Sequence, residues 1–175
     1  MTQGTHRRGA FLDRDGVLNV DHGYVHRPED LQLVPGASQA VAKLNEAGYT
    51  VVVVTNQSGV ARGMYTEADV DAFHAHMTRV FDKLRARIDA FYSCPYHHEA
   101  EVEAYLHEDH PDRKPNPGMI ERAISDLALE RDGSFLIGDK ESDMAAADAA
   151  GIAGHRFSGG RLDDLVNRIL SQAKG

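Results

Sequence analysis

The run of four valines at residues 51–54, inside the segment TVVVVTNQ, restricts the fold more than any other feature of the sequence. Valine favours an extended strand, and successive side chains of a strand point to opposite faces of its sheet. Four consecutive apolar residues therefore need cover on both faces. Strands buried in this way are typical of parallel sheets with helices packed on each side.

Short apolar runs and amphipathic helical patterns alternate along the rest of the chain. This alternation predicts an α/β fold with a doubly wound parallel sheet between two layers of helices. Thr66 with Asp69 forms a predicted capping box, and Asn116 is expected to cap a helix that begins at Pro117. We expect strands at 9–12, 50–57, 88–93, 134–138 and 152–157, and helices at 37–47, 66–84, 117–127, 143–150 and 161–172.

The size and composition of the chain fit one soluble domain over residues 1–175, with 42% apolar and 26% charged residues. No run approaches the ~20 apolar residues that span a bilayer, and the first residues lack an apolar signal segment. The single cysteine, Cys94, fits a reducing compartment. These features predict a cytoplasmic protein without a membrane partner. Because no exposed apolar stripe stands out, we expect a monomer.

The formal net charge of the chain is −8. A field of this sign repels phosphate backbones, so we expect no nucleic-acid partner. The same field would repel a small phosphorylated substrate. A phosphate-binding site in this chain therefore requires a local cluster of cations.

Four groups of polar residues follow predicted strands, at the edge of the sheet where their carboxyl ends meet. Helix capping would explain any one of these groups. Together they lie where open parallel sheets bind their ligands, which favours a shared site. The groups are Asp13 with Asp15, Thr55 with Asn56, Arg113 with Lys114, and Asp139 with Asp143.

Carboxylates without cysteine ligands favour a hard cation, and Mg²⁺ is the usual one beside a phosphate. Its predicted ligands are the side chains of Asp13 and Asp139 and the backbone carbonyl of Asp15. The metal and Lys114 would neutralise a phosphoryl group. Asp13 can then attack phosphorus as a nucleophile, while Asp15 protonates the leaving oxygen and later activates water.

These residues lie in motifs that resemble the four motifs of the haloacid dehalogenase superfamily of phosphatases: DRDG (13–16), the apolar run ending in Thr55, Lys114, and GDKESD (138–143). The segments FLDRDGVLNVDHGYV, VVVTNQSGVARG, RKPNPGM and IGDKESDM are similar to the group of D-glycero-D-manno-heptose 1,7-bisphosphate phosphatases and histidinol phosphatases. The segment NVDHGYV favours the heptose enzymes. The resemblance implies a Rossmann-like sheet without a large cap domain.

The resemblance also implies which residues surround the substrate. Thr55 and Lys114 would contact the phosphoryl group, and residues 19–35 would shield the site. The implied substrate-binding residues are Asp21, His22, Gly23, Tyr24, Thr55, Asn56, Gln57, Ser58, Arg62, Arg113, Lys114 and Lys140.

Three further residues receive supporting or peripheral roles. Asp143 is expected to orient Lys140 or to support the metal ligands rather than to react. His74 and His76 lie in a predicted helix whose apolar face is complete without them. We therefore expect both histidines at the surface or at the rim of the site.

The implied activity is removal of the 7-phosphate of D-glycero-D-manno-heptose 1,7-bisphosphate through an aspartyl-phosphate, in the synthesis of surface polysaccharide. Histidinol phosphate or another small sugar phosphate is the alternative substrate. The segment TNQSGVARG also resembles DNA 3′-phosphatases, but those need a basic surface for the strand, which a net charge of −8 disfavours. A binding module without turnover would be expected to have lost Asp13, Asp15, Lys114 or Asp139, and all four are present.

The segment CPYHHEAEVEAYLHEDHPDRK departs from the family pattern, which often carries a structural zinc in a C-x-H…C-x-C loop before the Arg-Lys pair. Here Cys94 with His97, His107 and His110 would give a Cys-His₃ set, which suits tetrahedral zinc. The alternative is a loop that has lost its metal and whose histidines are solvated.

Overall fold

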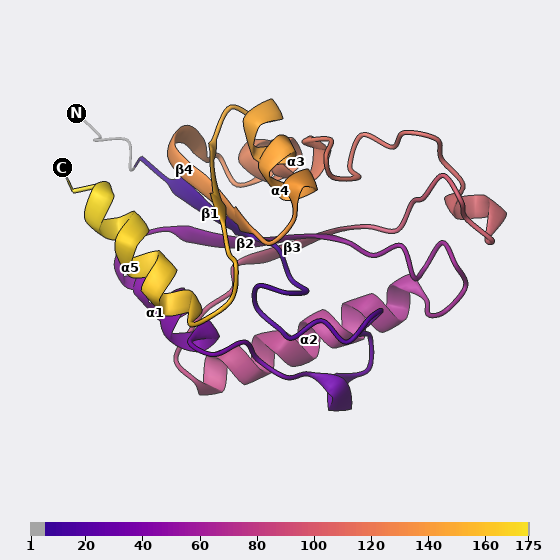
Figure 1. The fold of residues 1–175 in the computed structure, drawn as a ribbon, viewed down its shortest axis with the longest axis horizontal. Helices are drawn as coiled ribbons and strands as arrows, with labels where there is room; N and C mark the ends of the chain where they lie inside the picture. The colour runs from indigo at the N-terminus through magenta and orange to yellow at the C-terminus, as the bar shows by residue number, and fades with distance from the viewer. Residues whose placement is uncertain (1–5, 175) are drawn as a thin grey trace.

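The computed structural model describes residues 6–174 and contains one five-stranded sheet (Figure 1). All neighbouring strands pair in parallel, in the order β3-β2-β1-β4-β5. This confirms the predicted fold class. The strands are β1 (Arg8–Leu12), β2 (Thr50–Asn56), β3 (Ala90–Cys94), β4 (Glu130–Gly138) and β5 (Ala153–Arg156). The helices are α1 (Ala37–Glu46), α2 (Glu67–Lys83), α3 (Gly118–Asp126), α4 (Glu141–Ala149) and α5 (Leu162–Gln172), with short 3₁₀ turns at Pro28–Asp30 and Glu103–Tyr105.

Helices cover both faces of the sheet, as the valine run requires. Figure 1 shows α1, α2 and α5 on one side and α3 and α4 on the other. In β2, Val51 and Val53 belong to the core under the first group of helices, whereas Val52 and Val54 belong to the core under the second. The strand is buried on both faces because its side chains alternate between two apolar layers.

Several element boundaries differ from the sequence prediction. The capping box of Thr66 and Asp69 at the start of α2 is confirmed. Asn116 does not cap α3, because its amide donates instead to Asp109 and to the carbonyl of His110, and Pro117 takes the capping position. β4 begins four residues before the predicted 134–138, and an irregular stretch of its pairing with β1 accommodates the extra length.

The order of the strands creates a crevice above β1. The chain moves outward from β1 to β3 and then returns to the opposite side of β1 for β4. Loops leaving β1 and β4 diverge at such a switch point, which leaves a space at their carboxyl ends. Within residues 6–174 no further domain covers this edge, in agreement with the expected lack of a large cap. None of the described helices combines the length and apolarity needed to cross a membrane.

Candidate active site

The turn after β1 places Asp13 at the centre of the crevice. Its backbone N–H donates to the carbonyl of Ile137 in β4 (3.0 Å), which continues the β1–β4 pairing as far as Asp13. Gly16 closes this turn with a φ of +87°, and a Cβ at that position would lie 2.2 Å from Oδ2 of Asp139. Glycine is therefore required both by the backbone conformation and by the close approach of Asp139.

Lys114 is buried beside Asp13, and its ammonium has three acceptors. Nζ donates to Asp13 Oδ1 (2.9 Å), Asp143 Oδ1 (2.6 Å) and the carbonyl of Val54 (2.9 Å). Burial works to lower the pKa of Lys114, but the charges of Asp13 and Asp143 outweigh it and raise the pKa above its ordinary value. The lysine therefore stays charged and supplies the local cation that the acidic chain needs.

Burial also acts on Asp13. It raises the pKa of this carboxyl, Lys114 opposes the shift, and the nearby charges of Asp143 and Asp139 add to it. The pKa of Asp13 therefore lies above its usual range in the chain without a cation. A nucleophilic carboxylate must be ionised, so a further positive charge at this site would favour the reactive form.

A divalent cation fits the geometry of this cluster. Ligand oxygens of Asp13, Asp139 and Asp143 lie within 4.8 Å of one another. Lys114 satisfies one oxygen each of Asp13 and Asp143, whereas the buried Oδ1 of Asp139 has no hydrogen-bond partner among the described residues. An unsatisfied buried carboxylate oxygen beside two other carboxylates is the donor set that Mg²⁺ prefers.

The carboxylate of Asp15 is fixed by side chains that sequence reasoning did not assign to it. Arg14 donates to both of its oxygens (3.0 and 3.1 Å), Asn19 Nδ2 donates to Oδ1 (3.0 Å), and Gln57 Nε2 donates to Oδ2 (3.0 Å). Arg14 and Asn19 stand in the DRDGVLN segment, but nothing in the sequence distinguishes them from ordinary loop residues.

Gln57 connects Asp15 to the end of β2. Its Nε2 also donates to Thr55 Oγ1 (2.8 Å), and its Oε1 accepts the hydroxyl of the buried Tyr65 (2.7 Å). Burial raises the pKa of Tyr65 to about 12, so its hydroxyl remains a donor. Because an ionised carboxylate can only accept, Gln57 turns its N–H groups to Asp15 and Thr55, which leaves Oε1 to accept from Tyr65. No sequence pattern points to Tyr65.

Asn56 and Asp143 hold the two lysines of the site. The side chain of Asn56 accepts from the backbone N–H of Lys114 and donates to its carbonyl, both at 3.0 Å. Asp143 Oδ2 accepts the backbone N–H of Lys140 (3.1 Å). Asp143 therefore contacts Lys140 as expected, through the backbone, and also contacts Lys114, which was not foreseen.

A hollow of about 260 Å³ lies at the mouth of the site, beside a smaller one of about 50 Å³ that reaches Asp13 and Lys114. Three residues, Asp15, Asn56 and Lys140, line both. The remaining residues around the larger hollow are Asp21, Gly23, Tyr24, Gln57, Ser58 and Tyr65. The structure thus brings most of the predicted substrate residues to one opening.

Four predicted substrate residues line neither of these two hollows. One is Thr55, which still contacts Gln57 through its Oγ1. His22 lines a neighbouring hollow with residues 23–27. Arg113 donates to the carbonyl of Tyr96 (3.3 Å), and Arg62 lies 3.7 Å from a carboxylate oxygen of Glu99. The structure does not place the side chains of His22, Arg62 and Arg113 among the residues around Asp13.

The four predicted zinc ligands are not brought together. Within residues 6–174, neither group of potential ligands that converge on one point contains Cys94, His107 or His110. Nδ1 of His97, of His107 and of His110 each accepts a backbone N–H two residues along the chain. His110 stacks on Tyr96 with ring centroids 4.0 Å apart. The geometry thus gives the predicted zinc no support.

The prediction for His74 was wrong, whereas His76 is partly exposed. His74 is 7% exposed and stacks on Phe91 of β3, with ring centroids 4.3 Å apart. Burial lowers its pKa to about 3, which keeps the imidazole neutral. The apolar pattern of α2 did not indicate this burial, because the buried face of the helix includes His74 in addition to apolar residues.

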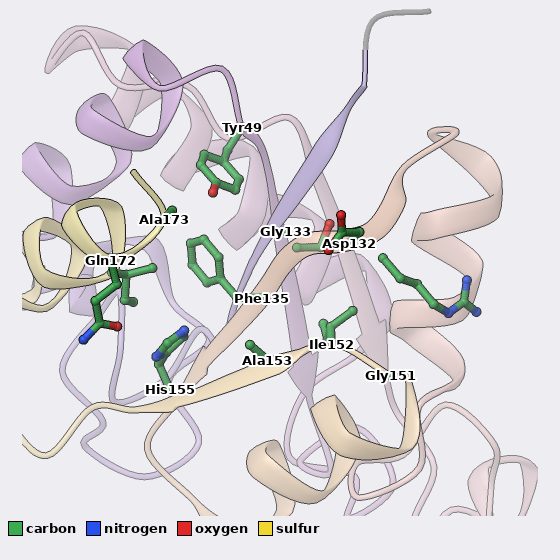
Figure 2. Close-up of a pocket in the computed structure, with 13 residues that line it drawn as sticks. Tyr49, Asp132, Gly133, Phe135, Gly151, Ile152, Ala153, His155, Gln172 and Ala173 are labelled. Atoms are coloured by element: carbon green, nitrogen blue, oxygen red, sulfur yellow. The ribbon is translucent and has the colours of Figure 1, made fainter. Parts of the chain in front are cut away.

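A separate hollow of about 410 Å³ lies away from the predicted site residues (Figure 2). It is bordered by Tyr49 and Phe135, whose rings meet edge to face at 5.2 Å, and by residues 151–153. None of the predicted catalytic, substrate-binding or metal residues lines it.

A five-stranded parallel sheet that carries Asp13 and Asp15 after its first strand, with Lys114 and Asp139 beside them, defines a phosphatase of the haloacid dehalogenase superfamily. The family model described as polynucleotide kinase 3 phosphatase matches residues 13–156. D-glycero-beta-D-manno-heptose-1,7-bisphosphate 7-phosphatase of Rhodopseudomonas palustris is 46% identical over 172 residues, which cover 97% of this chain and 94% of the relative.

Solved structures agree with this assignment. D,D-heptose 1,7-bisphosphate phosphatase from B. bronchiseptica, complexed with magnesium and phosphate, superposes with a TM-score of 0.80 at 30% identity, covering 94% of this chain and 99% of the other. A Mesorhizobium loti protein described as a HAD-like phosphatase gives 0.88 at 36% identity, covering 95% and 85%. The chain belongs to the heptose bisphosphate phosphatase and histidinol phosphatase group of this superfamily, as its motifs predicted.

Proposed function

We propose that this phosphatase removes the 7-phosphate of D-glycero-β-D-manno-heptose 1,7-bisphosphate, in the synthesis of heptose for surface polysaccharide. The observation that carries the proposal is the buried contact of Lys114 with Asp13, at an edge where Asp139 has an unsatisfied oxygen. The β anomer is proposed because the 46% identical relative bears that name.

Asp13 is the proposed nucleophile of the first step. One of its carboxylate oxygens attacks phosphorus, and the bond between phosphorus and the sugar oxygen breaks. Asp15, in its protonated form, gives its proton to that oxygen, so the sugar leaves as an alcohol and an aspartyl-phosphate remains. Lys114 faces the attacking carboxylate and offsets the negative charge that collects around the phosphoryl group.

The second step returns the enzyme to its starting state. A water molecule attacks the phosphorus of the aspartyl-phosphate and loses a proton to Asp15. The bond between phosphorus and Asp13 breaks, which releases inorganic phosphate and the free carboxylate. Thr55, whose Oγ1 accepts from Gln57, would direct its own hydroxyl proton toward a phosphoryl oxygen.

Mg²⁺ fits the proposed site, held by the side chains of Asp13 and Asp139 and the carbonyl of Asp15. When bound, it would supply the positive charge that neutralises these carboxylates and polarises the phosphoryl group. The rim residues 21–24 would contact the sugar, since Asp21, Gly23 and Tyr24 line the mouth of the site.

The test is phosphate release in the presence of Mg²⁺ from both anomers of the heptose bisphosphate and from histidinol phosphate. We expect a kcat/KM on the order of 10⁴ M⁻¹s⁻¹ or more on the β anomer and much lower values on the other two. Better turnover of histidinol phosphate would overturn the substrate assignment. Asp13→Asn is the matched control, because it keeps the shape of the side chain, and substantial activity in it would overturn the nucleophile assignment.

A further inference from the structure

Arg14 stands between the two aspartates of the DRDG motif and is the largest fully buried side chain among the described residues. Arginine is almost never fully buried unless its charge is paired. Its guanidinium packs over the ring of Phe73 in α2, with the central carbon 4.5 Å from the ring centroid. The proposed mechanism does not use this residue, so its burial needs another reason.

The charge of Arg14 is paired with the proposed general acid and base. Within residues 6–174, the sole carboxylate at ion-pair distance from Arg14 is that of Asp15, and the two side chains share three hydrogen bonds. A planar guanidinium bound at both oxygens fixes the rotation of a carboxylate as well as its position. A lysine at position 14 would supply charge without this fork.

The other side of the guanidinium is fixed by His74. Arg14 Nη1 lies 3.2 Å from Nε2 of His74. Because arginine remains protonated, this contact requires His74 to be neutral and to accept at Nε2. His74 is itself packed against Phe91.

Arg14 also reaches the substrate side of the crevice. Its Nη2 donates to the backbone carbonyl of Val25 (2.7 Å), in the segment that follows the rim residues 21–24. One guanidinium thus contacts the nucleophile loop, the substrate loop and helix α2.

We propose that Arg14 and His74 form a buried positioning pair that holds the carboxylate of Asp15 in the orientation needed for proton transfer to the leaving group. Arg14 acts through Asp15, and His74 acts through Arg14. This inference rests on the proposed function, because it assumes that Asp15 is the general acid.

If Arg14 and His74 position Asp15 for proton transfer, the effect of losing them should depend on the leaving group of the substrate. A sugar oxygen is a poor leaving group and needs a proton as its bond to phosphorus breaks, whereas p-nitrophenolate leaves without one. Loss of the correct orientation of Asp15 should therefore slow hydrolysis of the heptose bisphosphate far more than it slows release of p-nitrophenolate from p-nitrophenyl phosphate. A residue that only supports the fold would slow both reactions alike.

The experiment compares Arg14→Lys with the unmodified enzyme and with Asp15→Asn. We expect Arg14→Lys to lower both kcat/KM on the heptose bisphosphate and the rate of the first-turnover burst of p-nitrophenolate. The factor lost on the heptose bisphosphate should be at least about ten times the factor lost in the burst, which is within the usual range of general acid catalysis. Arg122→Lys, an exposed substitution on α3, is the matched control and should change neither reaction. Equal losses on both substrates in Arg14→Lys would overturn the inference.

His74 supplies a second, independent variant. His74→Leu removes the acceptor for Arg14 without changing charge, and His74→Gln can restore it through its amide oxygen. We expect the leaving-group effect in His74→Leu and its partial rescue in His74→Gln, with folding checked by circular dichroism. If Arg14→Lys does not fold, equal losses in His74→Leu would overturn the inference. Equal losses in Asp15→Asn would instead overturn the proposed role of Asp15, and the inference with it.

Discussion

Nζ of Lys114 donates to Oδ1 of Asp13 over 2.9 Å, although 101 positions separate the two residues in the sequence. The same ammonium contacts Asp143, which follows β4, and the carbonyl of Val54 in β2. A single cation in the loop after β3 therefore contacts the loop after β1, strand β2 and the first turn of α4. The site exists because the order of the strands brings these loops to one edge.

Replacing Lys114 should damage stability as well as activity. Lys114→Met leaves Asp13 and Asp143 buried without their cation, and breaking a buried pair costs about 3–5 kcal/mol. We expect a loss of that size in urea unfolding without Mg²⁺, together with no measurable phosphate release. The exposed Lys140 offers the control: Lys140→Met should change unfolding by less than about 0.5 kcal/mol. Similar stability losses in the two variants would contradict this account.

Gly16 and Gly48 offer a matched pair for the contact with Asp139. Both have a positive φ, but a Cβ at Gly48 would meet nothing within 4 Å. Gly48→Ala should therefore cost only the strain of a left-handed residue, about 1–2 kcal/mol, and keep full activity. Gly16→Ala must also displace the carboxylate of Asp139. We expect it to raise the Mg²⁺ concentration required for half-maximal phosphate release, and an unchanged Mg²⁺ requirement would contradict the described packing.

Tyr65 was not predicted as a site residue, but its contact with Gln57 should make it important for the reaction. Tyr65→Phe leaves the buried Oε1 of Gln57 without its donor, which costs about 1–3 kcal/mol. It also leaves the Gln57 amide, which donates to Asp15 and Thr55, with one contact fewer to hold it, so we expect a lower kcat. Tyr105→Phe is the control, because that hydroxyl bonds an exposed carboxylate of Glu67. Its effect on unfolding should be within about 0.5 kcal/mol, with kcat unchanged. Equal effects in both variants would reject a special role for Tyr65.

The stability of the protein should depend on His74 in mildly acidic solution. Burial lowers the pKa of His74 from an ordinary 6.5 to about 3. Below pH 6.5 the unfolded chain therefore binds a proton that the folded chain does not, and stability falls as the pH falls toward 3. Between pH 7 and pH 5 the residue should account for a loss of about 2 kcal/mol. That loss should be absent in His74→Gln and retained in the control His76→Gln, as measured by urea unfolding at each pH.

The loop at residues 94–115 should hold its shape without zinc. The predicted ligands are dispersed, and the ring of Tyr96 packs against His110. Metal analysis of protein purified without chelator should find less than about a tenth of an equivalent of zinc. One full equivalent, lost together with thermal stability on chelation, would show that the loop rearranges around a metal.

The sheet was predictable from the sequence because its signal is local. Alternating strands and helices, the valine run and the capping box at Thr66 each depend on neighbouring residues, and the structure confirms them. Short motifs likewise indicated Asp13, Lys114 and Asp139 at one edge. The predicted ends of strands were less accurate where hydrogen bonding to a neighbouring strand determines them. In β4 the first residues are not apolar, and they belong to the strand because Glu130 pairs with Arg8 of β1.

The supporting residues of the site could not be predicted, because their roles arise from contacts between distant elements. Arg14 lies 60 positions from His74, and Gln57 lies 42 positions from Asp15. Neither pair has a characteristic spacing, and a buried arginine has the same letter in the sequence as an exposed one. His74 of α2 is buried against Phe91 of strand β3, and the periodicity of a helix cannot report such a contact.

The central position of β1 has a consequence for synthesis on the ribosome. β1 is translated before the other four strands, and one of its two partners, β4, is translated more than a hundred residues later. Domains fold as their chains emerge, and pairings of high sequence separation form late. In a nascent chain that stops before β4, the backbone N–H of Asp13 lacks its acceptor at Ile137. The carboxylates of Asp139 and Asp143, which lie beside Asp13 in the folded protein, are also not yet present. The proposed site is therefore complete only after residues 130–143 have been translated.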